Sequence, residues 1–504
     1  MRGELKRLVI VGGGSAGWMT AAALSSLLSD SDVSITLVES DAIGTVGVGE
    51  ATIPDMVLFN QMLGVDEAEF MAATDATFKL GIEFVDWGRK GERYFHPFGR
   101  HGVDMQGIDF HQYWLAARAR GLREPIERYS MSANAAYAGR FAHPTQDNSP
   151  RAMIRYAYHM DATRYAAFLR RYAEGLGVMR VEGRVDAVAQ HPESGHVRKL
   201  SLDDGRTVEG DFFFDCTGFR ALLMRGALGV GFADWSHWLP CNSAQTVACA
   251  HNGPLMPYTR ATARGAGWQW RIPTQARTGN GHIYAADFTT DDAARDTLMD
   301  SLDGAPLGEP RLIRFTTGCL TRFWQGNVVG IGLASGFLEP LESTSLYLIQ
   351  AGISKFITLF PNGDLPDEVV DEYNRQMRRE FEQVRDFIVL HYHATQRDDS
   401  AFWNHVRTMP VPDSLARKIA LFRAAGRVFR DEDELFTRPS WTAVMLGQNV
   451  LPERVDAIVG ALPPAQVAHS LSSMRAGMLR AVDALPAHSD YLQRFTQTRP
   501  GHAA

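Results

Sequence analysis

The stretch Leu8-Val9-Ile10-Val11-Gly12-Gly13-Gly14-Ser15-Ala16-Gly17 decides the fold of this 504-residue chain. Four consecutive apolar residues, 8–11, are typical of a short strand buried on both faces of a parallel sheet. The glycines then form the pattern Gly-x-Gly-x-x-Gly, and the alanine-rich segment 18–28 follows as a predicted helix. Strand, glycine turn and helix in this order are typical of a dinucleotide-binding βαβ unit.

Each glycine of this turn has a physical role. Gly12 permits the tight turn, Gly14 lets a pyrophosphate approach the backbone, and Gly17 lets the helix pack closely on the strand. Residues 32–39 read as the second strand, and Glu39 ends it, about 20 residues beyond the turn, where a carboxylate can take ribose hydroxyls. The pattern alone leaves NAD and FAD open, and the alternative is a purely structural turn. Its position at the start of the chain favours FAD, and no second glycine fingerprint for NAD(P)H follows.

The rest of the chain predicts an α/β protein in two parts. We expect an FAD-binding Rossmann-like body of the glutathione-reductase type with an inserted mixed substrate region at 1–350, and a helical C-terminal part at 351–504. Strands are expected at 77–85, 210–215 and 327–333, a hairpin at 179–188 with 197–202, and irregular structure at 91–150. Helices are expected at 162–176, 414–428 and 464–485, with a long amphipathic helix around 370–388.

Composition excludes several classes of protein. A net charge of −7 gives no electrostatic footprint for nucleic acid. Four scattered cysteines fit neither a disulfide framework nor a zinc cluster, and the two histidines of His391-Tyr392-His393 are spaced wrongly for one helical face, so we expect no metal. No apolar run approaches the roughly 18 residues of a spanning helix or the roughly 7–15 of a signal-peptide core. We expect a cytoplasmic protein without membrane contact, and a homodimer stays open.

Only six of the 51 basic residues are lysine. One of them, Lys79, lies in the predicted strand 77–85 among Phe78, Leu80, Ile82 and Phe84, a pattern that indicates burial. Lysine can lose its proton when it is desolvated, whereas arginine cannot. The alternative is an ordinary lysine on the solvent face of the strand. Lys355 and Lys418 fall on predicted helices, where arginine would serve as well.

Three further motifs carry a family resemblance. They are Gly-Val-Gly-Glu-Ala-Thr-Ile-Pro at 47–54, Trp-Gln-Trp-Arg-Ile-Pro at 268–273, and Gly-Phe-Leu-Glu-Pro-Leu-Glu-Ser-Thr at 336–344. With the glycine turn and Lys79, the chain resembles the flavin-dependent halogenases of the tryptophan-halogenase family. The motifs run from residue 12 to residue 345 in the family's order. Beyond residue 350 only a generally helical tail matches.

The resemblance implies an activity. A separate flavin reductase would reduce FAD, either by contact or by diffusion of reduced FAD. The reduced FAD would then use oxygen to oxidise chloride or bromide to hypohalous acid. The acid would travel through an internal tunnel to a small, electron-rich aromatic substrate such as indole. A lysine would deliver the halogen there, either as a haloamine or as a hydrogen-bond donor to the acid. The competing functions are a single-component flavin-dependent aromatic hydroxylase and a non-catalytic FAD-binding scaffold.

The resemblance also assigns roles to residues. Lys79 and Glu342 would be catalytic, with Glu342 orienting the hypohalous acid or taking the proton from the substrate carbon; the alternative is an acid that only begins a helix. The backbone amides of Thr344 and Ser345 would hold the halide. FAD contacts are expected at the glycine turn and at Ser15, Ala16, Glu39, Gly49, Ala51, Val185, Leu333 and Leu346.

Aromatic residues complete the expected site. His96 and Phe98 would flank the substrate ring by stacking, with a structural loop as the alternative. Trp268 and Trp270 share one face of a strand and would separate the flavin from the substrate. The alternative is core packing, and both roles require the two indoles to be buried. The segment 436–449 contains Phe436, Trp441 and Asn449 but no tyrosine pair like the one that clamps free tryptophan in relatives. Indole, a larger indole compound or another electron-rich arene are therefore all candidate substrates.

Overall fold

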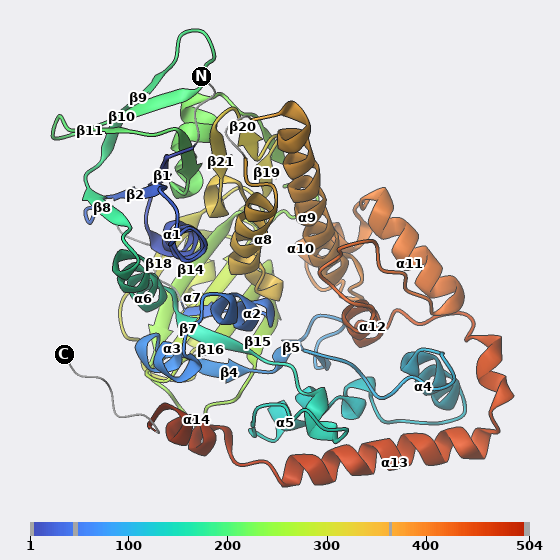
Figure 1. Cartoon of the computed structure of the whole chain (residues 1–504). Coiled ribbons are helices and arrows are strands. Elements are labelled where there is room, and N and C mark those ends of the chain that lie inside the picture. The colour runs from blue at the N-terminus through green and yellow to red at the C-terminus, as the bar shows by residue number, and fades with distance from the viewer. Residues whose placement is uncertain (1–4, 44–48, 362–364, 498–504) are drawn as a thin grey trace.

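The predicted nucleotide-binding α/β body is confirmed in the computed structural model, which describes residues 5–43, 49–361 and 365–497. Its main sheet has six strands in the order β20-β21-β12-β1-β2-β8 (Figure 1). All pairs in it are parallel except β20 with β21. The strands span β1 (Arg7–Val11), β2 (Ser34–Glu39), β8 (Met179–Glu182), β12 (Phe212–Asp215), β20 (Trp324–Gln325) and β21 (Val328–Gly330).

The apolar run of β1 reflects burial on both faces. Leu8 and Ile10 join the large core that packs under α1 (Gly14–Leu27) and α8 (Ser345–Thr358). Val9 and Val11 join a second core on the opposite face. That face is covered by a three-stranded sheet of β9 (Val185–Gln190), β10 (Val197–Leu202) and β11 (Thr207–Glu209). Because both faces are covered, residues 8–11 of β1 are all buried, as expected for a parallel strand, and Arg7 at its start is exposed.

A second sheet carries much of the candidate site. It has seven strands in the order β18-β14-β17-β16-β15-β5-β6, antiparallel except for β15 with β5. Its strands span β5 (Gly81–Val85), β6 (Arg93–Pro97), β14 (Ser243–Cys249), β15 (Thr259–Arg264), β16 (Gly267–Pro273), β17 (Thr278–Tyr284) and β18 (Arg311–Arg314). Two small sheets complete the body: β3-β7-β4, with β3 (Gly49–Ala51), β7 (Ala157–Asp161) and β4 (Thr77–Lys79), and β13-β19-β22, with β13 (Phe232–Asp234), β19 (Gly318–Leu320) and β22 (Gly336–Phe337).

The single strand predicted at 77–85 is wrong. The chain forms β4 in the sheet β3-β7-β4, crosses at Leu80, and continues as β5 in the seven-stranded sheet. Gly81 allows this close crossing, because a Cβ there would lie 2.4 Å from the backbone oxygen of His96. Lys79 is therefore the last residue of one sheet at the point where the chain enters another. The alternation of apolar residues at 78–84 correctly predicted that this segment is buried, but it did not predict the break between the two strands.

Two other local expectations are also wrong. The segment 179–188 does not form one arm of a hairpin, because β8 pairs in parallel with β2 in the main sheet and only β9 and β10 form a hairpin. The segment 91–150 is not irregular throughout, since it contains β6, α4 (Phe110–Ala119) and α5 (Met131–Tyr137). Many aromatic and histidine residues of this segment are buried. The mixture of Gly, His and Pro in its sequence gave no indication of this burial.

The helical C-terminal part is confirmed. After α8 the chain forms the 27-residue α9, and then four shorter helices before the terminal α14 (Figure 1). These helices span α9 (Asp367–His393), α10 (Ala401–Thr408), α11 (Asp413–Ala425), α12 (Arg438–Gly447), α13 (Pro464–Asp483) and α14 (His488–Gln497). Phe381 and Phe387 of α9 share one buried core with Leu8 of β1, and the division near residue 350 stays a prediction. No helix in the described ranges is long and apolar enough to cross a membrane.

Candidate active site

The glycine turn between β1 and α1 leaves no room for side chains. Gly12 has φ +100°, and a Cβ there would lie 2.4 Å from the backbone oxygen of Cys216 on the neighbouring chain segment. A Cβ on Gly17 would lie 2.0 Å from the backbone oxygen of Gly12. The turn thus presents bare backbone and the N-terminus of α1 at the carboxyl end of the sheet, where α/β proteins bind the phosphates of a dinucleotide.

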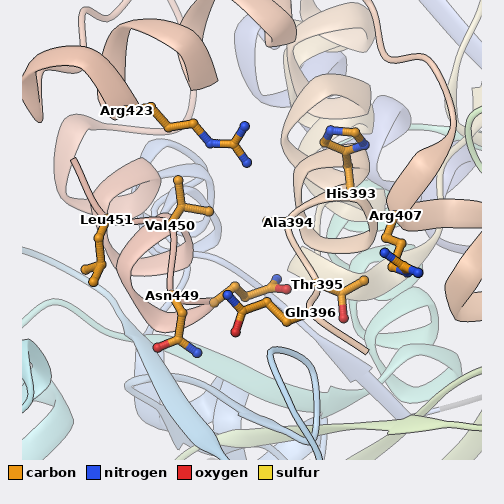
Figure 2. A pocket seen from close by; sticks show the side chains of 10 residues that line it. His393, Ala394, Thr395, Gln396, Arg407, Arg423, Asn449, Val450 and Leu451 are labelled. Atoms are coloured by element: carbon orange, nitrogen blue, oxygen red, sulfur yellow. The ribbon is translucent and has the colours of Figure 1, made fainter. Parts of the chain in front are cut away.

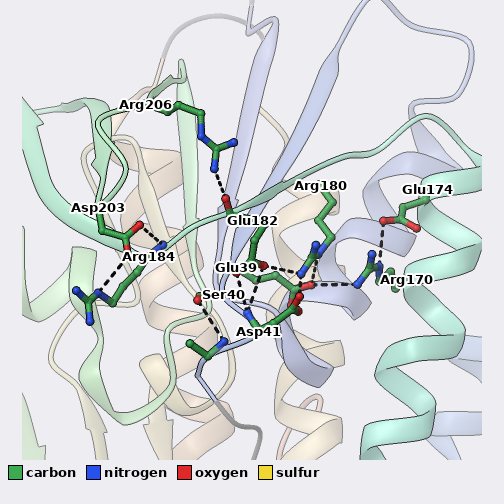
Figure 3. Close-up of polar contacts among 11 residues, drawn as sticks. Glu39, Ser40, Asp41, Arg170, Glu174, Arg180, Glu182, Arg184, Asp203 and Arg206 are labelled. Atoms are coloured by element: carbon green, nitrogen blue, oxygen red, sulfur yellow. Dashed lines mark hydrogen bonds and ion pairs between the residues drawn. The ribbon is translucent and has the colours of Figure 1, made fainter.

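Glu39 lies beside this turn at the end of β2 (Figure 3). Its Oε1 accepts a hydrogen bond of 2.7 Å from Nε of Arg180, which also pairs with Asp41 and Glu182. Its Oε2 is the atom nearest Gly13, where a Cβ would meet it at 1.6 Å. Arg180 therefore fixes the carboxylate with one oxygen directed at the glycine turn, and the residues present fit the ribose of a dinucleotide.

The other expected cofactor contacts come from several elements of the body. Ser15 and Ala16 lie in the first turn of α1, and a Cβ on Gly332 would lie 2.8 Å from Cβ of Ala16, which places Leu333 near the start of α1. Leu346 is buried in the first turn of α8. The remaining positions are Gly49 and Ala51 on β3 and Val185 at the start of β9. Gly47 and Val48 of the second motif lie outside the described residues.

Lys79 is fully buried at the end of β4. Its Nζ donates hydrogen bonds to the backbone oxygen of Thr52 at 2.9 Å and to Oγ of Ser343 at 2.8 Å, and it lies 5.1 Å from the centre of the Phe98 ring. Burial lowers the pKa of Lys79 from 10.5 to about 7, although the Glu342 carboxylate opposes this. Both the amine and the ammonium are therefore populated near neutral pH.

Glu342 is buried between two histidines. Nδ1 of His96 lies 2.9 Å from its Oε2, and Nε2 of His391 lies 2.8 Å from its Oε1. Burial raises the pKa of Glu342, but the two imidazoles outweigh this and hold it down to about 2. Nδ1 of His391 donates to the backbone oxygen of Phe387 at 2.8 Å, which directs the other ring nitrogen at the carboxylate. Glu342 is thus an ionised carboxylate throughout the neutral pH range.

The loop between Glu342 and α8 joins the lysine to the carboxylate. Ser343, which accepts the hydrogen bond from Lys79, has φ +60°, a left-handed conformation that costs a non-glycine residue of order 1–3 kcal/mol. Thr344 is the N-cap of α8, and its buried Oγ1 has no hydrogen-bond partner among the described residues. Ser345 begins the helix, so the first free backbone amides of α8 follow directly after the loop that bears Glu342.

A second buried carboxylate of the same loop, Glu339, binds the indole of Trp268. Nε1 of Trp268 and Oη of Tyr392 donate to Oε2 of Glu339 at 2.9 and 2.6 Å. Burial raises the pKa of Glu339 to about 7. Trp268 and Trp270 lie on one face of β16, as predicted, with ring centres 5.9 Å apart. The last turn of α9 therefore contacts both acids of the loop 339–342, Glu339 through Tyr392 and Glu342 through His391.

Aromatic rings line the side of the site that faces the C-terminal helices. Phe387 of α9 stacks on Phe436 with ring centres 3.7 Å apart and meets Trp441 at 4.9 Å. The His96 ring lies 5.7 Å from Phe387. The structure thus brings together His96, Phe98, Lys79 and Glu342, and it adds an aromatic cluster that the sequence indicated only in part.

His391 contacts Glu342, and the sequence did not indicate this contact. The spacing of the histidines at 391 and 393 does not suit one helical face, so the sequence alone assigns this pair no site. The structure explains the spacing, since His391 is directed at Glu342 while His393 lines a different cavity. Within the described ranges, no group of three or more His, Cys, Asp or Glu side chains could hold a metal ion. Only a residue-by-residue comparison of related sequences could have indicated His391.

Comparisons with known proteins identify the class. The tryptophan halogenase family matches residues 7–464. Tryptophan 6-halogenase SttH of Streptomyces toxytricini is 34% identical over 97% of this chain and 98% of its own length. Xcc4156, a flavin-dependent halogenase from Xanthomonas campestris, has a similar structure, with TM-score 0.95 and 47% identity over 98% of this chain and 99% of that chain. BrvH, a flavin-dependent halogenase from Brevundimonas sp. BAL3, is also similar, with TM-score 0.94 and 46% identity over 97% of this chain and 99% of that chain.

The fold and the site therefore define a flavin-dependent enzyme of the halogenase class. The chain belongs to the tryptophan halogenase family. The family resemblance expected from the ordered motifs is confirmed.

Proposed function

We propose that the protein halogenates an indole-like or other electron-rich aromatic compound, with Lys79 delivering the halogen and Glu342 orienting it. The observation that carries this proposal is the buried Lys79 amine, whose pKa is lowered to about 7 and which is held between Ser343 and the Phe98 ring. A lysine that titrates near neutrality can act as a nucleophile or as a strong hydrogen-bond donor. A hydroxylase or a scaffold has no use for such a group.

The residues present fit FAD. The bare glycine turn, Glu39 beside it and the start of α1 would hold its pyrophosphate and ribose, and the contacts at Gly49, Ala51, Val185, Leu333 and Leu346 would hold the rest. When bound in its reduced form, FAD supplies with oxygen the oxidising capacity that turns halide into hypohalous acid. The chain has no second nucleotide fingerprint, which supports reduction of FAD by a separate flavin reductase.

The halide would bind at the start of α8. The first backbone amides of this 14-residue helix have no intrahelical partners, and they favour an anion. The unpartnered Oγ1 of Thr344 is a further donor at the same end. Thr344 and Ser345 would therefore hold chloride or bromide directly beside the loop that bears Glu342.

Trp268 and Trp270 would separate the oxidation step from the arene. Trp268 is 1% exposed and is fixed by Glu339, and a Cβ on Gly281 would lie 2.1 Å from the Trp270 ring. Such closely packed indoles admit a small neutral molecule only through a defined path. This supports transfer of hypohalous acid to Lys79 instead of direct oxidation of the substrate.

Glu342 would act as an ionised group. With its pKa held near 2, it can accept a hydrogen bond from hypohalous acid and stabilise the positive charge that electrophilic attack creates on the ring. Its low pKa makes it a weak base, so orientation and charge stabilisation outweigh proton abstraction. The aromatic cluster of Phe387, Phe436 and Trp441, with His96 and Phe98, would hold a flat substrate by stacking.

The test is a reconstituted reaction. FAD, a flavin reductase, NADH, oxygen and bromide or chloride are supplied with indole, and the product is identified by mass. We expect halogenated indole from the wild type and from Lys90→Ala, which removes an exposed lysine paired with Asp399, and none from Lys79→Ala. Hydroxylated product without halogen would contradict the proposal in favour of the hydroxylase. No product from any of several arenes, despite reduced FAD, would favour the scaffold.

A further inference from the structure

A cavity of about 440 Å³ lies among the C-terminal helices and shares no lining residue with the Lys79 site. Its walls come from the end of α9 and the segment after it, from α10, from α11 and from the segment after α12 (Figure 2). Its volume lies within the range of about 300–1,000 Å³ that is usual for small-molecule sites. We call it the Arg423 pocket, after the arginine of α11 that lines it (Figure 2).

The charge of this pocket is positive. Arg423 of α11 and Arg407 of α10 approach it from two sides, and none of the ten lining residues is acidic. The guanidinium of Arg407 is held by Oδ1 of Asn404, at 2.6 and 3.0 Å. No carboxylate of the described residues forms an ion pair with Arg423 or with Arg407. Burial lowers the pKa of His393, and the charge of Arg423 lowers it further.

Two of the lining residues, Gln448 and His393, each have a buried polar atom with no partner in the described part of the chain. Gln448 is fully buried, and its Nε2 donates to Oη of Tyr94 at 3.2 Å and to the backbone oxygen of His391 at 3.0 Å. Its Oε1 has no donor among the described residues, and Nδ1 of His393 likewise has no partner. The side chain of Asn449 is already bound to Glu92 at 2.9 Å. A buried amide oxygen without a donor is costly, and neither Oε1 of Gln448 nor Nδ1 of His393 is exposed to the pocket.

We propose that the Arg423 pocket binds a small organic acid, with its acid group on the guanidinium of Arg423. A carboxylate and an organic phosphate share this chemistry, because a guanidinium binds both in the same forked geometry. The cavity is too large for an inorganic ion alone. Val450 and Leu451 supply an apolar wall for the carbon part of the ligand. This inference does not rest on the halogenation chemistry.

The pocket is also connected to the candidate active site. Gln448 binds the backbone oxygen of His391, and the side chain of His391 contacts Glu342. A ligand that packs against Gln448 would therefore stiffen the turn of α9 that contacts the carboxylate. This connection gives the pocket a route to influence the reaction without contact with the substrate.

Calorimetric titration of the full-length protein at low salt tests the proposal. The probes are benzoate, phenyl phosphate, their neutral counterpart benzamide, and inorganic phosphate. We expect at least one of the two organic acids to bind, and benzamide to bind at least about tenfold more weakly, because it lacks the charge-assisted bond to Arg423. Benzoate and phenyl phosphate together separate a carboxylate site from a phosphate site.

Variants assign the binding to this pocket. Arg423→Gln should weaken the binding of the organic acid at least about tenfold, and Arg423→Lys should restore part of it. Arg417→Gln is the matched control, because Arg417 is exposed on the same helix and does not line the cavity. Thermal melting of each variant verifies that it is folded.

Several results would overturn the proposal. Equal binding to Arg423→Gln and to wild type would place the acid elsewhere, including in the aromatic site near Lys79. Equal affinity for benzamide and benzoate would remove the role of charge. Binding of inorganic phosphate alone, or no binding of any probe at several millimolar, would mean that the cavity does not take an organic acid.

Discussion

Two buried lysines of this protein have different surroundings. Lys418 on α11 pairs directly with Glu434 at 2.8 Å and with Asp431 at 3.3 Å, and it lies 5.0 Å from the Trp441 ring. Lys79 lies 5.1 Å from the Phe98 ring, but its hydrogen bonds go to a backbone oxygen and a hydroxyl. Both side chains are buried. The difference is the charge of the hydrogen-bond partners, which is negative for Lys418 and neutral for Lys79.

This difference bears on the catalytic role proposed for Lys79. A directly paired carboxylate stabilises the ammonium, so a buried ion pair keeps its charge and holds two elements together. Neutral acceptors do not offset the desolvation of Lys79, and its amine becomes accessible near neutral pH. Glu342, which could have formed such a pair, is instead engaged by His96 and His391.

The largest expected effect is on chemistry at Glu342. Glu342→Gln should lower the rate of halogenation by roughly 10²–10⁴-fold, because the neutral amide cannot stabilise a positively charged ring. The initial rate of product formation is measured by mass spectrometry. Glu368→Gln, an exposed position at the start of α9, serves as the control. A rate for Glu342→Gln within threefold of wild type would show that the carboxylate is not needed.

The two lysines should differ in stability when they are replaced by methionine. Lys418→Met leaves the buried Glu434 carboxylate without its partner, which should cost about 3–5 kcal/mol of unfolding free energy. Lys79→Met leaves only neutral acceptors and should cost far less. Urea denaturation of both variants measures the difference. Equal losses for the two would mean that the nature of the partner does not distinguish these sites.

The lowered pKa of Lys79 predicts a dependence of stability on pH. The unfolded chain binds this proton up to about pH 10.5 and the folded chain only up to about pH 7, so wild-type stability should rise with pH between these values. The rise attributable to Lys79 is on the order of a few kcal/mol. It is obtained as the difference in pH slope between wild type and Lys79→Met. Parallel curves for the two proteins would argue against a depressed pKa.

The smallest of these effects is expected at the histidines of α9. His391→Asn should lower kcat by up to roughly a hundredfold with little change in KM, since Glu342 loses one of the groups that position it. His393→Asn, two residues further along, should leave both constants near wild type. A drop in KM or kcat of the same size in both variants would instead indicate a general disturbance of α9.

Contiguous features of the fold could be predicted from the sequence, and features assembled across the chain could not. The glycine turn and Glu39 act locally, and each lies where its pattern indicated. Lys79 and Glu342 followed from motifs, and the structure brings them to one site. The break between β4 and β5 at Gly81 depends on the close approach of β6. The contact of His391 with Glu342 depends on the packing of α9 against the site. Neither the break nor the contact leaves a periodic pattern in the sequence. Burial of Lys418 was missed because its partner, Glu434, lies beyond the helix.

The most direct test of the central claim is a titration of the lysines themselves. The chain has six lysines, so selective ¹³C labelling at the ε position gives a small set of NMR signals, and comparison with Lys79→Met assigns one of them. We predict that the signal absent from Lys79→Met titrates near pH 7. A signal for Lys79 that changes only above about pH 9, as an ordinary lysine does, would contradict the account.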